Sequence, residues 1–248
     1  MLLDPASLLI LVGGTLFAFT VSTTLGLGGG VLMLPPMLMV YDTPTAIAMI
    51  APLMLVNAVG KIWVFRRDLD LGLALWLGLL SWPLALIAGF SVDQVDARYL
   101  KGGIVMLIGL MLGIEHGLGR KIQVTWRGLQ IWGAATGILA GLTGVSGPTL
   151  ALALKGHGVE GRAFVAVVAT VVLGLQVLRL PAYVASGLLP ESQVPMLVTL
   201  GAVAMTAIAL GRRVQRHLSV ARWRSALDVL LFGVAVWLSA DVLGLISR

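Results

Sequence analysis

Residues 26–36, with the sequence GLGGGVLMLPP, interrupt a long apolar region near the start of the chain. Glycines at positions 26, 28, 29 and 30 each weaken a helix by roughly 1 kcal/mol, and Pro35 and Pro36 remove backbone hydrogen-bond donors. The sequence therefore predicts a helix break here. Water is absent from the hydrocarbon core of a membrane, so broken backbone at that depth persists only where it is buried in protein or lines a cavity. The break is thus a candidate binding site.

A second interrupted stretch, GLTGVSGPTLALAL, occupies residues 141–154. Shifting the sequence by 118 positions places Gly26 on Gly144 (144 − 26), and the same shift, without a gap, places Lys61 on Arg179 (179 − 61). One constant offset predicts a duplicated unit.

Composition indicates an all-α polytopic membrane protein. Hydrophobic residues make up 58% of the chain and charged residues 11%, against about 25% charged residues in soluble proteins. Apolar runs of about 20 residues recur, each long enough to span the ~30 Å of hydrocarbon in a bilayer. The excess of basic over acidic residues, 17 against 11, lies mostly in short loops. We therefore expect these basic residues to set the orientation of the protein in the membrane rather than to bind nucleic acid.

Several chemistries find no support in the residues. The chain has no Cys, which excludes disulfides, thiolate ligands and Cys nucleophiles. It also has no HExxH motif, no paired metal ligands and no P-loop. We expect neither a metal nor a cofactor.

Eight long apolar segments and two short interrupted ones are expected. The long segments are 6–25, 45–65, 72–92, 99–114, 128–142, 163–185, 194–210 and 226–246, and the short ones are 31–41 and 149–154. We assign residues 1–248 to one transmembrane transporter domain. Repeat one covers 6–114, a basic linker 115–127, and repeat two 128–248.

Basic residues favour one topology, because Lys and Arg prefer the cytoplasmic side of a membrane. If the short pieces dip in and return, the two sides carry nine and six basic loop residues. If each short piece completes a crossing, the division is twelve against three. The larger set is then Arg66, Arg67, Arg120, Lys121, Arg127, Lys155, Arg162, Arg212, Arg213, Arg216, Arg222 and Arg224, and the smaller is Arg98, Lys101 and Arg248. The second division predicts inverted repeats, a cytoplasmic linker and a multi-pass protein of the inner or plasma membrane.

The two breaks predict where a ligand binds. Secondary transporters place Gly/Pro-interrupted helices at corresponding positions of two repeats, with the binding site between them. A helix that starts after a glycine turn offers unpaired N–H groups and the positive end of its dipole to an anion. The candidate residues are Gly28, Gly29, Gly30, Val31, Gly144, Ser146, Gly147 and Thr149. The alternative is that these small residues only allow close helix packing.

Four polar side chains within apolar segments extend the candidate site. Asn57 and Gln176 lie one position apart under the 118-residue shift, and either side chain could reach a substrate or hydrogen-bond another helix. Lys61 and Arg179 correspond under the shift. Either cation could attract an anion or extend to the membrane interface.

Three stretches carry a resemblance to a known family: GLGGGVLMLPP, the TPTAIA turn at 43–48, and GILAGLTGVSGPTLALAL at 137–154. The chain resembles the TauE/SafE family of sulfite exporters, within the toluene-sulfonate uptake permease superfamily, over nearly its whole length. The resemblance implies a secondary transporter that exports a small anion such as sulfite or an organosulfonate. The second motif departs from the first, with Ser146 and Pro148 opposite Gly28 and Gly30.

The partners expected from this resemblance and from the composition are a small anionic substrate and the lipid bilayer. A proton or sodium ion could drive transport, and an oligomer is compatible with the sequence. Two repeats that share one site also favour alternating access over a continuous pore.

Two other classes of function compete. The GVSG sequence at 144–147 matches the GxSG pattern of intramembrane serine proteases, whose Ser needs a base, usually a His on a neighbouring segment. The three histidines, His116, His157 and His217, all fall in expected loops. A membrane scaffold also fits the hydrophobicity, but it gives no reason for two interrupted segments.

Overall fold

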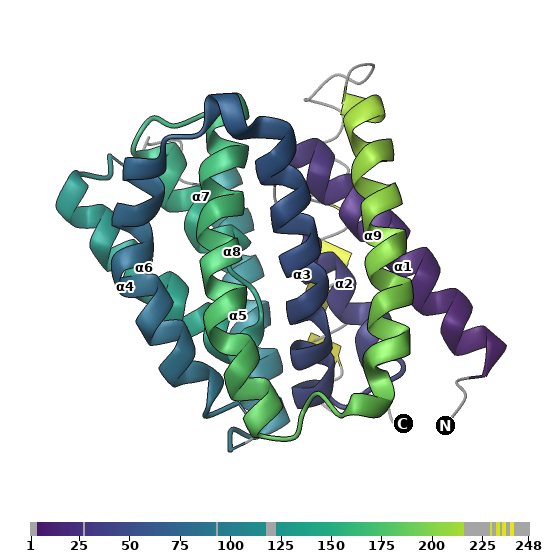
Figure 1. Cartoon of the computed structure of the whole chain (residues 1–248). Coiled ribbons are helices and arrows are strands. Elements are labelled where there is room, and N and C mark those ends of the chain that lie inside the picture. The colour runs from purple at the N-terminus through teal and green to yellow at the C-terminus, as the bar shows by residue number, and fades with distance from the viewer. Residues whose placement is uncertain are drawn as a thin grey trace.

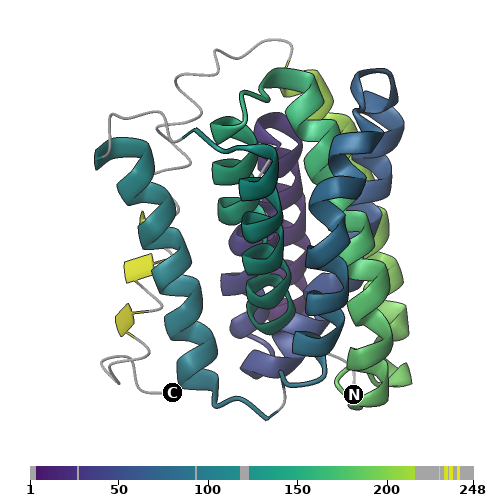
Figure 2. The ribbon, with the colours of Figure 1, turned by 90° about the vertical axis from the view of Figure 1, so that its left-hand side faces the viewer.

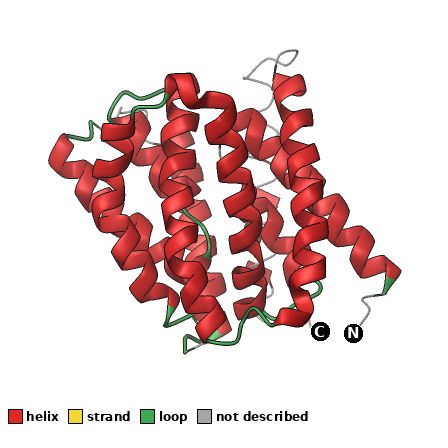
Figure 3. Cartoon of the chain, viewed as in Figure 1, coloured by secondary structure: helices red, strands yellow, loops and turns green. Residues whose placement is uncertain are grey.

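The computed structural model describes residues 4–26, 28–92, 94–117 and 123–215, together with positions 229, 232, 233, 235, 236, 239 and 240. Within these residues the chain is helical, as predicted, and short loops join the helices (Figure 3). The elements are α1 (Pro5–Leu25), α2 (Gly29–Leu38), α3 (Thr43–Phe65), η1 (Arg66–Asp68), α4 (Leu71–Gly89), α5 (Ala97–Gly117), α6 (Trp126–Thr143), α7 (Gly147–Gly156), α8 (Gly161–Ala185), η2 (Glu191–Gln193) and α9 (Val194–Gln215).

Five of the described helices, α1, α3, α4, α8 and α9, are long and apolar enough to cross a membrane. Most of the expected segment 226–246 and residues 118–122 of the linker 115–127 lie outside the described residues. The short elements α2 and α7 have ten residues each. At 1.5 Å per residue each is about 15 Å long, half the thickness of the hydrocarbon core. Neither short helix spans a membrane by itself.

Polar side chains mark the starts of several helices. Asp4, Asp42, Asp70 and Thr125 each accept a hydrogen bond from the backbone N–H three residues further on, at the starts of α1, α3, α4 and α6. These caps satisfy donors that would otherwise lack a partner.

The glycines break the helices, whereas the prolines do not. Gly26 ends α1 with φ 83° and Gly144 ends α6 with φ 77°, a left-handed conformation that favours glycine. Pro35 and Pro36 lie inside α2, so the prediction that they help to break the helix is wrong. α2 continues through them beside α1, where a Cβ added to Gly14 would lie 2.7 Å from Pro36 Cγ. The proline ring therefore packs where α1 has no side chain.

The helices alternate in direction (Figures 1 and 2). α1, α3, α5 and α9 run upward in Figure 1, and α4, α6 and α8 run downward. α3 and α8 pack together at the centre, with α9 and α1 on one side and α4 and α6 on the other. α4 and α6 approach closely, since a Cβ at Gly137 would lie 2.3 Å from Ser81 O.

Basic residues gather at one end of this bundle. They flank the upper ends of the helices in Figure 1, in η1 after α3, in the first turns of α6 and α8, and in the last turns of α7 and α9. These residues are Arg66, Arg67, Arg127, Lys155, Arg162, Arg212 and Arg213. Arg98 and Lys101, in the first turns of α5, lie at the lower end. The described members of the two predicted sets thus separate to opposite ends.

Candidate functional site

The two breaks meet at one small cavity of about 30 Å³ in the centre of the bundle. A Cβ added to Gly30 would lie 3.3 Å from Gly144 O, so the backbones of the two breaks are almost in contact. Nine predicted site residues line this cavity: Gly28, Gly29, Gly30, Val31, Asn57, Lys61, Gly144, Ser146 and Gly147. Thr149, Gln176 and Arg179 are not among its lining residues.

Two helix N-termini lie at the cavity. α2 follows Gly28, whose φ is 89°, and α7 follows Ser146, and at neither start does a side chain of the capping residue accept a hydrogen bond. In α2 the N–H of Leu32 is the one that reaches back to Gly28 O, at 2.8 Å. The preceding N–H groups, from Gly29 to Val31, belong to the set that an α-helix cannot satisfy internally. They are therefore suited to holding an anion.

The second helix start offers fewer donors. Pro148 occupies its first turn and has no N–H. The Thr149 hydroxyl, predicted as a donor to the ligand, donates instead to Ser146 O at 3.0 Å. Of the two breaks, the glycine-rich one offers more backbone donors to the cavity.

Lys61 is the charged side chain of this cavity. Among the residues that line it, Lys61 alone carries a formal charge. It is 4% exposed, and Nζ donates to Ser22 Oγ at 2.8 Å. An ammonium group has three donors, so the Ser22 bond leaves two N–H groups for a ligand. Because the surroundings have a low dielectric constant, an anion there would be attracted more strongly than in water.

Asn57 lies one helical turn before Lys61 and on the same face of α3. Its side chain is 1% exposed, and Oδ1 is buried without a hydrogen-bond partner. A buried polar atom left unpaired is destabilising by about 1–3 kcal/mol. This oxygen only accepts hydrogen bonds, so it could pair with a donor group of a ligand but not with an anionic oxygen.

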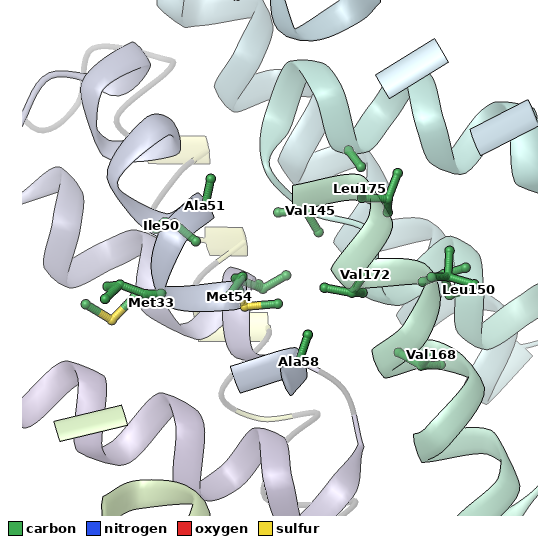
Figure 4. Close-up of a cluster of buried hydrophobic side chains, with 14 of the residues drawn as sticks. Met33, Ile50, Ala51, Met54, Ala58, Val145, Leu150, Val168, Val172 and Leu175 are labelled. Carbon is green, nitrogen blue, oxygen red and sulfur yellow. The ribbon is translucent and has the colours of Figure 1, made fainter. Parts of the chain in front are cut away.

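Apolar side chains close the cavity on both sides. Figure 4 shows Met54 and Ala58 of α3 on one side and Val168 and Val172 of α8 on the other. These four residues are all at most 8% exposed. The polar groups of the cavity are therefore flanked by hydrocarbon on both sides, which lowers the local dielectric constant.

Arg179 and Gln176 form a separate cluster. The Nε and Nη2 atoms of Arg179 donate to Gln176 Oε1 at 2.9 and 2.6 Å, and Nη1 donates to Ala140 O. Arg179 Cζ lies 5.6 Å from the ring centroid of Tyr183, whose hydroxyl donates to Gly141 O at 3.0 Å. The guanidinium is fully buried. These contacts occupy both predicted side chains away from the cavity.

Some lining residues were missed by the sequence reasoning. Ser22 and Met54 lie at the cavity, and nothing about a Ser or a Met in an apolar segment distinguishes it from a packing residue. The 118-residue shift places Ser22 on Ala140, whose carbonyl accepts from Arg179. The Arg179 contact is visible only in the structure, so the sequence carried no signal for Ser22.

The sequence comparison supplies the family. The family model described as sulfite exporter TauE/SafE matches residues 10–238. The chain belongs to this family. No curated protein and no solved structure matched the chain in the same comparisons. TauE/SafE proteins are membrane transporters of sulfur-containing anions, so this chain is a membrane transporter and not an enzyme.

Membership in the TauE/SafE family confirms the resemblance and sets aside the protease and scaffold alternatives. The geometry of α7 agrees with this outcome. His157 caps the C-terminal end of α7 and its Nδ1 lies 2.8 Å from Val124 O, whereas Ser146 precedes the opposite end of the helix. The ten residues between them extend for about 15 Å, too far for a base to reach the Ser hydroxyl.

Proposed function

We propose that this TauE/SafE protein exports sulfite or a small organosulfonate across the inner or plasma membrane, with the anion held in the cavity between the two breaks. One observation carries the proposal: the unpaired N–H groups that open α2, the start of α7 and the Lys61 ammonium all meet at one buried cavity. An oxyanion with three oxygens can accept hydrogen bonds from several of these donors at once. Each hydrogen bond that involves a charged group contributes about 1.5–3 kcal/mol.

We propose further that the chain consists of two inverted repeats. α2 and α7 begin 118 positions apart (147 − 29), and so do α3 and α8 (161 − 43). α3 and α8 run in opposite directions, as do α1 and α6, and α4 and α9. A duplication in which the second copy is turned over in the membrane accounts for both the offset and the reversal.

The size of the cavity favours alternating access. The cavity is small, about 30 Å³, and the side chains of Ser22, Asn57 and Lys61 in its wall are at most 4% exposed. An anion of four heavy atoms would reach these buried groups only if the helices around them separate. We therefore infer that the described conformation is closed, and that movement of α3 and α2 against α8 and α7 opens it to each side in turn.

Purified protein in liposomes tests this function. Labelled sulfite should enter protein-containing vesicles faster than empty vesicles, with a rate that saturates as the sulfite concentration rises. Unlabelled methanesulfonate should compete with it. Equal rates in the two kinds of vesicle would overturn the proposed substrate class. A steady single-channel current carried by sulfite would overturn alternating access.

A further inference from the structure

A groove between α3 and α9 lies apart from the central cavity. Its volume is about 650 Å³, and it follows the upper halves of the two helices in Figure 1, which shows them side by side. Most of its lining is apolar, and Arg212 and Arg213 stand at one end. The complete lining is Val59, Gly60, Trp63, Val64, Met205, Ile208, Ala209, Arg212 and Arg213.

The walls of this groove face outward from the bundle. Trp63 is 72% exposed, Met205 53% and Val59 49%. At Gly60 the two helices approach so closely that an added Cβ would lie 2.7 Å from Ile208 Cδ1. This contact forms the floor of the groove. Because α3 and α9 are long enough to cross a membrane, the open side of the groove faces lipid.

Charge accumulates at one end of the groove only. Arg212 and Arg213 lie in the last turn of α9, and both side chains are exposed. Arg66 follows α3 at the same end of the bundle, with Cζ 4.7 Å from the ring centroid of Trp63. None of the nine lining residues is acidic. A molecule that fills the groove would therefore need a long apolar part and a negatively charged head.

We propose that this groove binds an anionic phospholipid. One acyl chain lies along Val59, Trp63 and Met205, and the phosphate meets Arg212 and Arg213. An Arg guanidinium pairs with phosphate oxygens through two parallel hydrogen bonds. Trp63 lies at the same end as the arginines, where an aromatic side chain suits the boundary between acyl chains and headgroups. The basic end of the bundle also matches the membrane leaflet that carries anionic lipid.

Native mass spectrometry of the purified full chain with phosphatidylglycerol tests the headgroup contact. The double variant R212Q/R213Q should bind phosphatidylglycerol at least tenfold more weakly than the unaltered chain. The matched control is R127Q/R162Q, which removes two exposed arginines at the same end of the bundle but on α6 and α8. That control should bind normally. Equal binding by the two double variants would overturn the proposal.

A third variant tests the acyl-chain contact. Ala209 is exposed and lines the groove, so Ala209→Trp fills the groove and leaves both arginines in place. We expect it to lower phosphatidylglycerol binding severalfold, while a Trp at the exposed Ala202 of the same helix leaves binding unchanged. If Ala209→Trp binds as much lipid as Ala202→Trp, the lipid is held by charge alone and the groove is not its site.

Discussion

Lys61 and Arg179 correspond under the 118-residue shift, yet their surroundings differ. Lys61 lines the central cavity and donates to Ser22 Oγ. Arg179 is enclosed, and Gln176 Oε1 accepts two of its hydrogen bonds. Position 58, the counterpart of Gln176 (176 − 118), is Ala58, which lines the cavity. We propose that the space at Ala58 holds the ligand beside Lys61, whereas the Gln176 amide fills the corresponding space beside Arg179.

The difference indicates that Lys61 keeps N–H groups available to a ligand, whereas Arg179 uses its hydrogen bonds to join helices. Arg179 connects α8 to Ala140 O of α6, just before the second break. Lys61 connects α3 to α1 through the hydroxyl of Ser22, just before the first break. We infer that Lys61 serves to bind the anion, whereas Arg179 serves to hold α8 and α6 together.

The largest expected effect concerns Gln176→Leu. This change removes the acceptor of two Arg179 hydrogen bonds and leaves a buried cation poorly compensated. We expect destabilisation by about 1.5–3 kcal/mol for each lost hydrogen bond to the charged group. The control is Asn57→Leu on α3, where the amide oxygen is unpaired. Thermal unfolding in detergent should show a large drop for the first variant only, and similar midpoints for both would contradict the structural role of Arg179.

A loss of transport is expected for Gly29→Leu. A Cβ at Gly29 would lie 2.8 Å from Ser22 Oγ and 3.3 Å from Met54 Sδ, so a leucine fills the space at the first break. Such overpacking destabilises a protein by about 1–3 kcal/mol, which a melting curve would report. Sulfite flux in liposomes should fall to the level of empty vesicles. Gly13→Leu on α1, where an added Cβ meets nothing within 4 Å, should keep its flux.

A smaller change is expected for Lys61→Met. Removing the ammonium should weaken sulfite binding by about 1.5–3 kcal/mol, the contribution of a hydrogen bond to a charged group, and raise the half-saturating concentration roughly 10–100-fold. Folding stability should stay the same or rise, because a buried charge with one neutral partner is removed. An unchanged half-saturating sulfite concentration would show that Lys61 does not meet the anion.

Much of the fold could be predicted from the sequence because helix signals are local. Apolar segment lengths placed α3 and α4 within a few residues of their observed bounds. The effect of Pro35 and Pro36 was misjudged because it depends on Gly14, a residue on another helix. Helix interiors accept proline only where the neighbouring structure compensates for it.

The sequence predicted which backbone segments form the candidate site better than it predicted which side chains line the cavity. The glycines at 26–30 and 144–147 indicated broken helices, and the constant offset paired the two breaks. The offset could not show that Gln176 and Arg179 bond each other outside the cavity. That outcome depends on three-dimensional neighbours such as Tyr183 and Ala140, which no pattern of spacing in the chain reveals.

Sulfite flux through the variant Ala58→Gln tests most directly whether the open space beside Lys61 holds the anion. This variant places an amide three residues before Lys61, as Gln176 stands before Arg179. We predict a folded protein in which the new side chain fills the cavity, bonds Lys61 and stops transport. Ala202→Gln, at an exposed position of α9, should transport normally. A normal rate of sulfite transport by a folded Ala58→Gln protein would contradict the account.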